Sequence, residues 1–325
     1  MKKIVVTGGS GYIGQHFCKR IKETTDYEVI IIDNLSVGNF ASKYCDSHYT
    51  LNISESEEVF KAHKDIDAVV HFAASCDVNE SIKNPSKYFN NNTKETLSFL
   101  DLLVKYNVKN LIFSSTCTVF SNTDAKIFEN MRRNPLNPYG LSKMFSEDMI
   151  KVYSSTYNIN STVLRYFNVV GVADDRGIGY DINDNKLIPA AIRAIFESQK
   201  LNVYTTLENH THDNTCIRDY IHVEDLVDAH VLVLEDMLKS KKKSYDSYHL
   251  GRGEGNTTLE IIKQLEYKTG LKMKMELAGI REGDPPSLVA DPRKFKQQFN
   301  WMPRRDMYKI LESSIDWYIL QRNKK

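Results

Sequence analysis

The chain has 325 residues, enough to bury a sizeable core in one large domain or two coupled domains. Its 43 basic and 42 acidic residues give a net charge of +1, so no general charge excess favours nucleic acid or an anionic membrane as a partner. The five cysteines are odd in number and form no C-x-x-C pair, which argues against a disulfide framework and a zinc site. With no signal-like start and no long apolar segment, we expect a cytoplasmic protein without a metal.

Short β-branched runs alternate with segments whose apolar residues recur at helical spacing, such as Pro85–Tyr106. Runs that are apolar throughout indicate strands buried on both faces, as in a parallel sheet covered by helices. The fold class predicted is therefore α/β, with a doubly wound parallel sheet of the Rossmann type. Its predicted strands are Ile4–Thr7, Val29–Asp33, Ala68–Phe72, Leu111–Ser115 and Thr162–Tyr166.

The pattern changes after Tyr166, where a loop rich in Gly, Asp and Asn (171–185) precedes an apolar helix and shorter elements follow. We therefore predict a first domain over residues 1–168, with roughly 214–240 returning to it. A smaller, partly interleaved C-terminal α/β domain would cover residues 169–325.

The first predicted strand runs into Thr7-Gly8-Gly9-Ser10-Gly11-Tyr12-Ile13-Gly14, which contains two overlapping glycine fingerprints of dinucleotide-binding turns. Glycines at this place permit a tight turn and let a pyrophosphate approach the backbone at a helix N-terminus. Asp33 ends the next predicted strand, where a carboxylate can accept from both ribose hydroxyls and repels the 2′-phosphate of NADP. The turn and Asp33 together predict an NAD site.

Tyr139 and Lys143 lie four residues apart and hence on one face of a predicted helix. A cation near a phenol stabilises its phenolate, so such a tyrosine can exchange a proton with a substrate hydroxyl. Thr116 follows the predicted strand 111–115, at the sheet edge where open α/β sheets bind ligands. Thr116, Tyr139 and Lys143 are therefore the predicted catalytic residues.

These motifs, with others along the chain, resemble the UDP-glucose (UDP-galactose) 4-epimerases of the extended short-chain dehydrogenase/reductase family. The resemblance covers essentially the whole length, and its C-terminal motifs are the more specific ones. The matching stretches are 7–14, 33–36, 71–74, 88–92, 139–143, 165–168, 213–223 (DNTCIRDYIHV), 250–255, 281–291 (REGDPPSLVAD), Trp301 and Pro303.

The resemblance implies residue roles at the matching positions. A tightly bound NAD would be held by Gly8, Gly11, Tyr12, Ile13, Gly14, Asp33, Asn34, Ser36, Asn52, Ile53, Phe72, Ala73, Ala74, Asn92, Ser114, Tyr139, Lys143 and Phe167. A UDP-sugar would be held by Thr116, Asn168, Leu187, Tyr204, Arg218, Arg281, Asp284 and Leu288. Two arginines suit a pyrophosphate, which a guanidinium can bind in a bidentate manner.

The implied reaction oxidises C4 of the sugar and reduces it again on the other face, interconverting UDP-glucose and UDP-galactose. Cys117 and Thr118 stand where related dehydratases and decarboxylases carry acidic residues, which favours simple epimerisation. The alternatives are another UDP-sugar 4-epimerase, an NAD(P)-dependent sugar-nucleotide reductase, and a non-catalytic NAD-sensing or scaffold protein.

The resemblance also implies a homodimer and bears on the range of sugars. Leu288 stands where some relatives carry a bulky tyrosine, so its smaller side chain suggests tolerance of UDP-GlcNAc and UDP-GalNAc. The sequence departs from the family pattern at Cys76, Asn52, Lys186 and Thr205.

Overall fold

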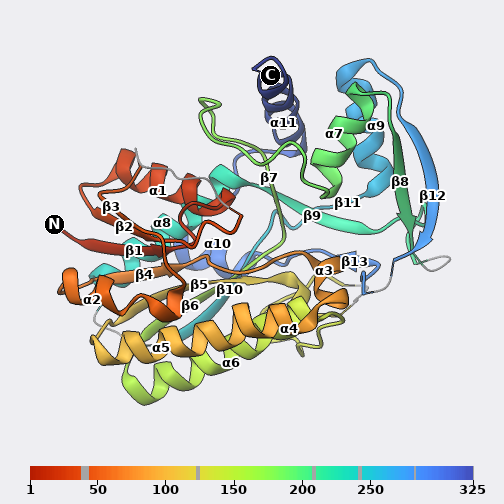
Figure 1. Ribbon diagram of the computed structural model, residues 1–325. Coiled ribbons are helices and arrows are strands. Elements are labelled where there is room, and N and C mark those ends of the chain that lie inside the picture. The colour runs from red at the N-terminus through yellow and green to blue at the C-terminus, as the bar shows by residue number, and fades with distance from the viewer. Residues whose placement is uncertain (38–43, 122–124, 207–209, 241–243, 282, 325) are drawn as a thin grey trace. The chain divides into compact units, whose positions relative to one another are not determined.

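The computed structural model describes residues 1–37, 44–121, 125–206, 210–240, 244–281 and 283–324 (Figure 1). The chain divides into two compact units, each assembled from separate stretches of sequence. Unit 1 contains Met1–Ser121, Arg132–Tyr166 and Val227–Tyr248, and unit 2 contains Asn122–Met131, Phe167–Leu226 and His249–Lys325.

A seven-stranded sheet forms the centre of unit 1, in the order β10-β6-β5-β4-β1-β2-β3. The pairs from β6 through β3 are parallel, which confirms the predicted doubly wound α/β fold. Successive strands are added on one side of β1 as β2 and β3 and on its other side as β4, β5 and β6. The switch point between β1 and β4 is where such α/β sheets bind ligands. The strands are β1 (Lys3–Thr7), β2 (Glu28–Ile32), β3 (Ser47–Tyr49), β4 (Ala68–His71), β5 (Asn110–Thr116), β6 (Asn160–Tyr166) and β10 (Tyr245–Leu250).

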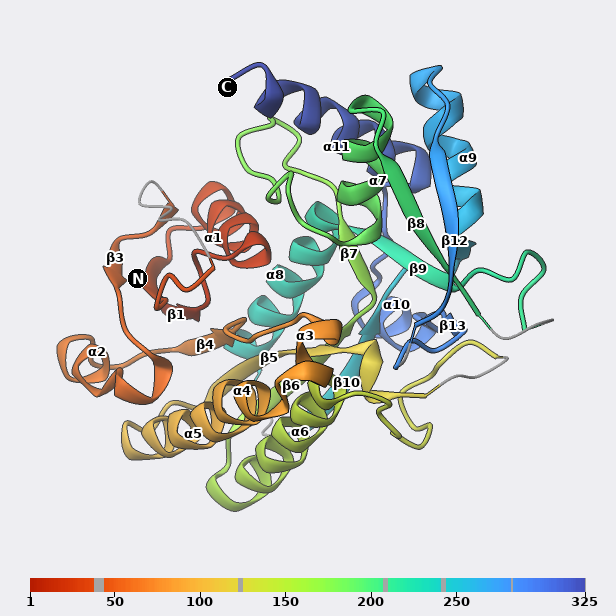
Figure 2. The same cartoon turned by 45° about the vertical axis from the view of Figure 1, so that its right-hand side comes forward.

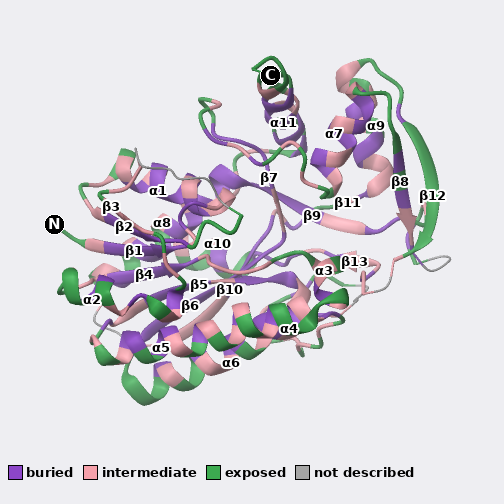
Figure 3. Ribbon diagram, in the orientation of Figure 1, coloured by how far each residue is buried: buried purple, intermediate pink, exposed green. Residues whose placement is uncertain are grey.

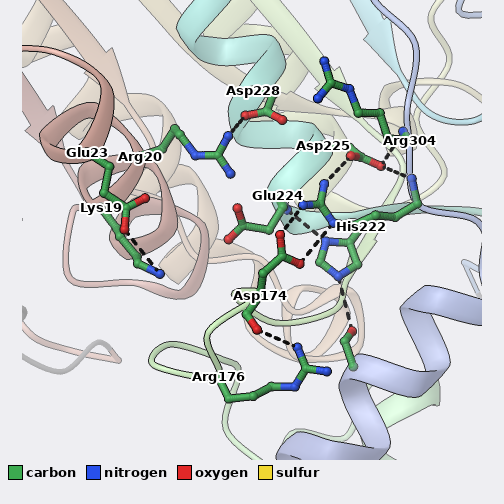
Figure 4. Close-up of polar contacts among 12 residues, drawn as sticks. Lys19, Arg20, Glu23, Asp174, Arg176, His222, Glu224, Asp225, Asp228 and Arg304 are labelled. Carbon is green, nitrogen blue, oxygen red and sulfur yellow. Dashed lines mark hydrogen bonds and ion pairs between the residues drawn. The ribbon is translucent and has the colours of Figure 1, made fainter.

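Helices cover both faces of this sheet: α1 and α8 lie on one side, and α5 and α6 on the other (Figures 1 and 2). An ion pair between Arg20 and Asp228 joins α1 to α8 (Figure 4). The strands are buried along most of their length, whereas the outer faces of α5 and α6 are partly exposed (Figure 3). The helices are α1 (Tyr12–Thr24), α2 (Glu57–Ala62), α3 (Val78–Lys83), α4 (Pro85–Tyr88), α5 (Glu95–Lys105), α6 (Pro138–Tyr157) and α8 (Val223–Lys239), with 3-10 turns η2 (Ile53–Glu55) and η4 (Cys117–Val119).

The predicted helix over Pro85–Tyr106 is not one continuous α-helix. Its middle, Phe89–Lys94 (η3), is a π-helical turn between α4 and α5. The Asn92 side chain within this turn hydrogen-bonds Ser142 of α6 at 3.0 Å. A π turn inserts one residue into the helical repeat and often occurs at functional sites, yet it leaves apolar spacing almost unchanged.

In its described residues, unit 2 contains two small sheets and four helices. In the four-stranded sheet, β9 pairs with β7, β11 and β13; the second sheet pairs β8 with β12 in parallel. Helix α9 begins with a capping box between Thr257 and Glu260 and ends at Gly270 in the left-handed conformation. The elements are β7 (Asn168–Val170), α7 (Leu187–Phe196), β8 (Lys200–Thr205), β9 (Ile217–His222), β11 (Gly255–Thr257), α9 (Thr258–Thr269), β12 (Lys274–Ile280), β13 (Ser287–Leu288), α10 (Arg293–Phe299) and α11 (Met307–Arg322).

Buried polar contacts anchor the start of α8 within unit 2. Asp225 accepts the backbone N–H of Arg304 at 3.0 Å, and the Nε2 atom of His222 lies 3.2 Å from the Ser313 hydroxyl of α11 (Figure 4). These contacts tie β9 to α11, and the start of α8 to the segment that precedes α11. Over the described part of the chain, no helix is long and apolar enough to cross a membrane.

Candidate active site

The glycine turn follows β1 and leads into α1. Gly8 has a φ of +67°, and a Cβ atom there would lie 2.6 Å from the backbone nitrogen of Ala73. A Cβ on Gly14 would lie 2.2 Å from the carbonyl oxygen of Gly8. Helix α1 starts after Gly11 without a side-chain cap, so an anion can approach its first backbone N–H groups directly. Backbone geometry therefore requires these glycines, and the turn fits a dinucleotide pyrophosphate.

Predicted ribose-side residues come together where β2 and β3 end. The Asp33 carboxylate accepts the backbone N–H groups of Ser10 at 3.0 Å and of Leu35 at 2.8 Å. The amide of Asn34 donates to Asn52 at 2.9 Å. Two further predicted residues lie close by: the N–H of Ser36 donates to Asn34 at 3.0 Å, and Ile53 is buried in the core of unit 1. Asp33 thus has a fixed orientation beside the glycine turn.

Phe72, Ala73 and Ala74 follow β4, next to the same turn. The N–H of Phe72 donates to the carbonyl oxygen of Thr7 at 3.0 Å, which holds this segment against the end of β1. Asn92 is buried, and its amide both accepts from and donates to the backbone of Ser75, at 2.8 and 2.9 Å. In the structure Asn92 therefore orders the wall formed by residues 72–75.

The predicted catalytic side chains meet where β5 ends and α6 begins. Asn137 caps α6 by accepting the N–H of Gly140 at 2.8 Å. A Cβ on Gly140 would lie 2.2 Å from the Thr118 carbonyl oxygen, so this glycine lets the helix approach the strand end closely. Tyr139 and Thr116 are joined by a side-chain hydrogen bond.

Lys143 lies one helical turn further along α6 and is buried. Its ammonium group donates to the Ser114 carbonyl oxygen at 2.8 Å and lies 4.6 Å from the centre of the Phe113 ring. Residues 114, 116, 139 and 143, which the sequence places in one site, are therefore brought together. Another hydroxyl, Thr118 Oγ1, lies 3.0 Å from Thr116 Oγ1.

Burial dominates the electrostatics of this cluster. It lowers the pKa of Lys143 to about 8, although charge interactions with Cys76 and Glu147 act in the opposite direction. Burial also raises the pKa of Tyr139 well above its ordinary value, with a further increase from Cys76, while the Thr116 hydrogen bond lowers it. The lysine can thus change charge near the physiological range, whereas burial by itself favours the neutral form of Tyr139, and a nearby cation such as the Lys143 ammonium favours its phenolate.

A second group of predicted residues gathers in unit 2. Arg218 on β9 donates to Asp284 at 3.4 Å, and the Arg281 guanidinium lies 4.0 Å from the other oxygen of the same carboxylate. The Arg281 guanidinium also stacks on Tyr204 of β8, 3.6 Å from the ring centre. The group presents two cations, one carboxylate and one aromatic ring, which suits a ligand with both a phosphate and a planar base.

The remaining predicted residues of unit 2 lie on several elements. Leu288 of β13 is buried and in register with Arg218. Asn168 begins β7 and pairs with Tyr220 of β9. Leu187 begins α7 and packs against the core of unit 2, while Phe167 contacts the ring of His249 at a centroid distance of 5.8 Å. Direct contacts thus join Tyr204, Arg218, Arg281 and Asp284, with Leu288 adjacent through the strand register.

Two residues near the catalytic cluster were not predicted as part of the site. Glu147 is a fully buried carboxylate on α6, and Tyr88 packs edge-on against Tyr139 at a centroid distance of 6.3 Å. For Glu147 a signal was available, because it follows Tyr139 and Lys143 at four-residue steps on the same helix face. Tyr88 begins the matching stretch 88–92, but the resemblance assigned a role only to Asn92 within it.

Comparison with known proteins agrees with this arrangement. Residues 4–251 match the model of the NAD dependent epimerase/dehydratase family. The chain is 36% identical to the UDP-glucose 4-epimerase of Streptococcus mutans serotype c, covering 97% of this chain and 96% of that protein. It is 33% identical to UDP-arabinose 4-epimerase 1 of Arabidopsis thaliana, covering 98% and 80%.

Solved structures show the same fold over the full length. The UDP-glucose 4-epimerase of Bifidobacterium longum, in complex with NAD+ and UDP, matches with a TM-score of 0.91 and 31% identity over 100% of both chains. The UDP-Glc/GlcNAc 4-epimerase of Campylobacter jejuni matches with a TM-score of 0.82 and 33% identity, covering 98% of this chain and 100% of that one. This chain is therefore an epimerase that belongs to the NAD dependent epimerase/dehydratase family.

Proposed function

We propose that this enzyme interconverts UDP-glucose and UDP-galactose by oxidation and re-reduction at C4 of the sugar, with NAD retained between turnovers. The observation that carries the proposal is the cluster of Thr116, Tyr139 and Lys143 at the end of β5, in the same unit as the glycine turn after β1. The similarity to UDP-glucose 4-epimerases over nearly the whole chain supports the choice of substrate.

Unit 1 would hold NAD and unit 2 the uridine diphosphate. The turn from Gly8 to Gly14 would take the pyrophosphate of NAD on backbone N–H groups, and Asp33 would accept from the adenosine ribose hydroxyls. Arg218 and Arg281 would bind the substrate pyrophosphate, with the Tyr204 ring beside the uracil. When bound, NAD supplies the hydride acceptor and donor.

Tyr139 would carry the proton chemistry. As the phenolate, it would accept the proton of the sugar 4-hydroxyl while C4 loses a hydride, and so become a phenol. It would return that proton once the 4-keto sugar has turned its other face. The Lys143 ammonium would stabilise the phenolate that takes this proton, and the Thr116 hydroxyl would orient the substrate hydroxyl toward the Tyr139 oxygen. Each cycle takes up and returns one hydride and one proton, so the reaction has no net redox change.

A second candidate range of sugars is UDP-GlcNAc and UDP-GalNAc. Leu288 favours these acetylated sugars because its side chain is smaller than the tyrosine that some relatives carry at this position. The similar Campylobacter jejuni enzyme is named a UDP-Glc/GlcNAc 4-epimerase. The similarity to a UDP-arabinose 4-epimerase makes a pentose substrate a third candidate. Turnover assays with UDP-glucose/UDP-galactose, with UDP-GlcNAc/UDP-GalNAc and with a UDP-pentose pair rank these candidates. If the enzyme turns over UDP-glucose/UDP-galactose briskly and the acetylated pair not at all, the acetylated sugars are excluded as substrates.

The proposed assembly is a homodimer in a reducing compartment such as the cytoplasm. Apolar side chains on the outer faces of α5 and α6, namely Leu97, Phe145 and Val152, supply an apolar surface for self-association. No disulfide joins the five cysteines, all of which lie in the described part of the chain.

The Tyr139→Phe variant tests the proposed proton transfer. Removing the phenol hydroxyl leaves no group to take the substrate proton, so kcat should fall by about 10²- to 10⁴-fold. Tyr153→Phe is the matched control, because it removes a phenol hydroxyl from the same helix, where it bonds Asp101 at the protein surface. Interconversion measured by separating UDP-glucose from UDP-galactose gives the result; a Tyr139→Phe enzyme at the wild-type rate contradicts the mechanism.

A further inference from the structure

Glu147 is a buried carboxylate on the same helix face as Tyr139 and Lys143, one turn beyond the lysine. One of its oxygens accepts from the Ser115 hydroxyl at 2.5 Å and from Arg165 Nε at 2.9 Å. The other accepts from Arg165 Nη2 at 2.7 Å and from Arg133 Nη1 at 3.0 Å. Four donors therefore fix the carboxylate, three of them from two charged side chains.

These donors come from three parts of unit 1. Ser115 lies on β5 immediately before Thr116, Arg165 lies on β6, and Arg133 lies in the segment that precedes α6. Removing one partner from such a buried, charged network leaves the others unsatisfied and is costly. Through Glu147, the strand that carries Thr116 is thus locked to the helix that carries Tyr139 and Lys143.

The negative charge of Glu147 also acts on Lys143. Burial disfavours the ammonium form of Lys143, and the Glu147 carboxylate and any thiolate at Cys76 favour it. The charged and titratable groups facing this pair are Cys76 after β4, His71 on β4, Tyr139 and Asp148 on α6, Arg133 before α6, Arg165 on β6 and Tyr245 on β10. Arg133 and Arg165 are both cations, so loss of Glu147 would leave Lys143 in a more positive environment.

We propose that Glu147 is a positioning residue for this active site, which aligns Thr116 with Tyr139 and keeps the Lys143 ammonium protonated. This inference rests on the proposed catalytic roles of those three residues. Glu147 itself contacts neither Tyr139 nor a reacting atom, so it acts through Ser115 on the strand side and through its charge on the lysine side.

The pH dependence of Glu147→Gln is the decisive experiment. Without the carboxylate charge, Lys143 should lose its proton at lower pH, so the alkaline limb of kcat against pH should move down by roughly one pH unit. Glu147→Asp keeps the charge but shortens the side chain; its kcat should fall by about tenfold while its alkaline limb stays at the wild-type pH. An NMR titration of the 13C-labelled lysine ε-carbon, assigned with Lys143→Arg, follows the same proton without relying on turnover.

Asp148→Asn is the matched control. It removes the other carboxylate that Arg133 contacts, at 2.5 Å, but the Asp148 side chain is half exposed and bonds Arg133 rather than Ser115 or Arg165. Its alkaline limb and its Lys143 titration should match those of the wild type. Equal shifts in Asp148→Asn and Glu147→Gln would overturn the inference, because a general loosening of the Arg133 region would then explain both.

Folding of the variants needs an independent check, because Glu147→Gln leaves Arg165 buried beside a neutral amide. Ser115→Ala removes one hydrogen bond to Glu147 and retains both ion pairs, so it should fold, lower kcat and leave the alkaline limb in place. An unchanged kcat in Ser115→Ala, or an unshifted Lys143 titration in folded Glu147→Gln, contradicts the proposal. Inactivity of the wild type toward UDP-sugars would instead refute the proposed function, and the lysine titration would still report on Glu147.

Discussion

At the scale of single residues, His71 makes the stability of unit 1 sensitive to acid. Its ring lies 2.5 Å from the Thr7 hydroxyl and 3.2 Å from the Thr96 hydroxyl, which joins β4 to β1 and α5. Burial, with a smaller effect of the Lys143 charge, lowers the pKa of His71 to about 3. The unfolded chain takes up this proton near pH 6.5 and the folded chain only near pH 3, so folding stability decreases as the pH falls through that interval.

His71→Gln should therefore have a shallower loss of stability with acid than the wild type. The difference in slope of the unfolding free energy, measured by urea titration between pH 6 and pH 4, should approach about 1.4 kcal/mol per pH unit. His63→Gln, at a partly exposed histidine beside Glu28, is the control for the exchange of histidine for glutamine itself. Parallel slopes for the wild type and His71→Gln would show that His71 does not take part in acid unfolding.

The sequence predicts single residues well where the chemistry depends on local spacing. Tyr139 and Lys143 lie four residues apart and Thr116 ends a strand, so their meeting follows from the fold class alone. The Glu147 network could not be derived in this way, because its arginines at 133 and 165 approach only through tertiary structure. In the same way, the stacking of Arg281 on Tyr204 joins positions 77 residues apart.

At the scale of elements, the turn between β1 and α1 depends on the absence of a side chain at Gly8. Gly8→Ala should destabilise the protein strongly and reduce the NAD it retains, because the new Cβ meets the backbone of residues 72–73 at a positive φ. Gly270→Ala is a matched control, since Gly270 has a φ of +69° and no atom within 4 Å of its Cβ position.

The Gly270→Ala control should therefore lose only about 1 kcal/mol of unfolding free energy, from backbone strain at its positive φ. Thermal unfolding and the quantity of NAD released on denaturation measure both effects. A loss of stability at Gly8→Ala no larger than that at Gly270→Ala would mean that close approach to residues 72–73 is not what the turn requires.

The elements themselves were predicted to different degrees. Five strands with apolar β-branched runs were found, and each matches a strand of the sheet within one or two residues at its ends. Strands β3 and β10 were missed because Ser47-His48-Tyr49 and Tyr245–Leu250 are largely polar at the two edges of the sheet. The π turn at 89–94 was also missed, because one inserted residue leaves the apolar spacing close to that of an α-helix.

At the scale of the whole molecule, the proposed homodimer depends on the exposed faces of α5 and α6. Phe145 and Val152, two turns apart on α6, have 41% and 61% of their surface exposed. Replacing both by glutamate should give a monomer, because burying two carboxylates against an apolar partner is unfavourable. Light scattering after size exclusion at micromolar concentration measures the mass.

Leu277→Glu serves as the control, because this leucine of β12 is 63% exposed but belongs to unit 2 and not to α5 or α6. It should leave the assembly unchanged. A monomeric wild type, or a double variant that keeps the dimer mass, would contradict the proposed interface.

The central claim is that the enzyme keeps its NAD and returns the hydride to the same sugar. The most direct measurement is conversion of UDP-galactose to UDP-glucose by the purified protein without added cofactor, together with identification of the nucleotide released on denaturation. The account predicts conversion to equilibrium, about one NAD per chain and no net change in absorbance at 340 nm. Conversion that requires added NAD(P)H and consumes it in proportion to product would contradict the account and identify a reductase.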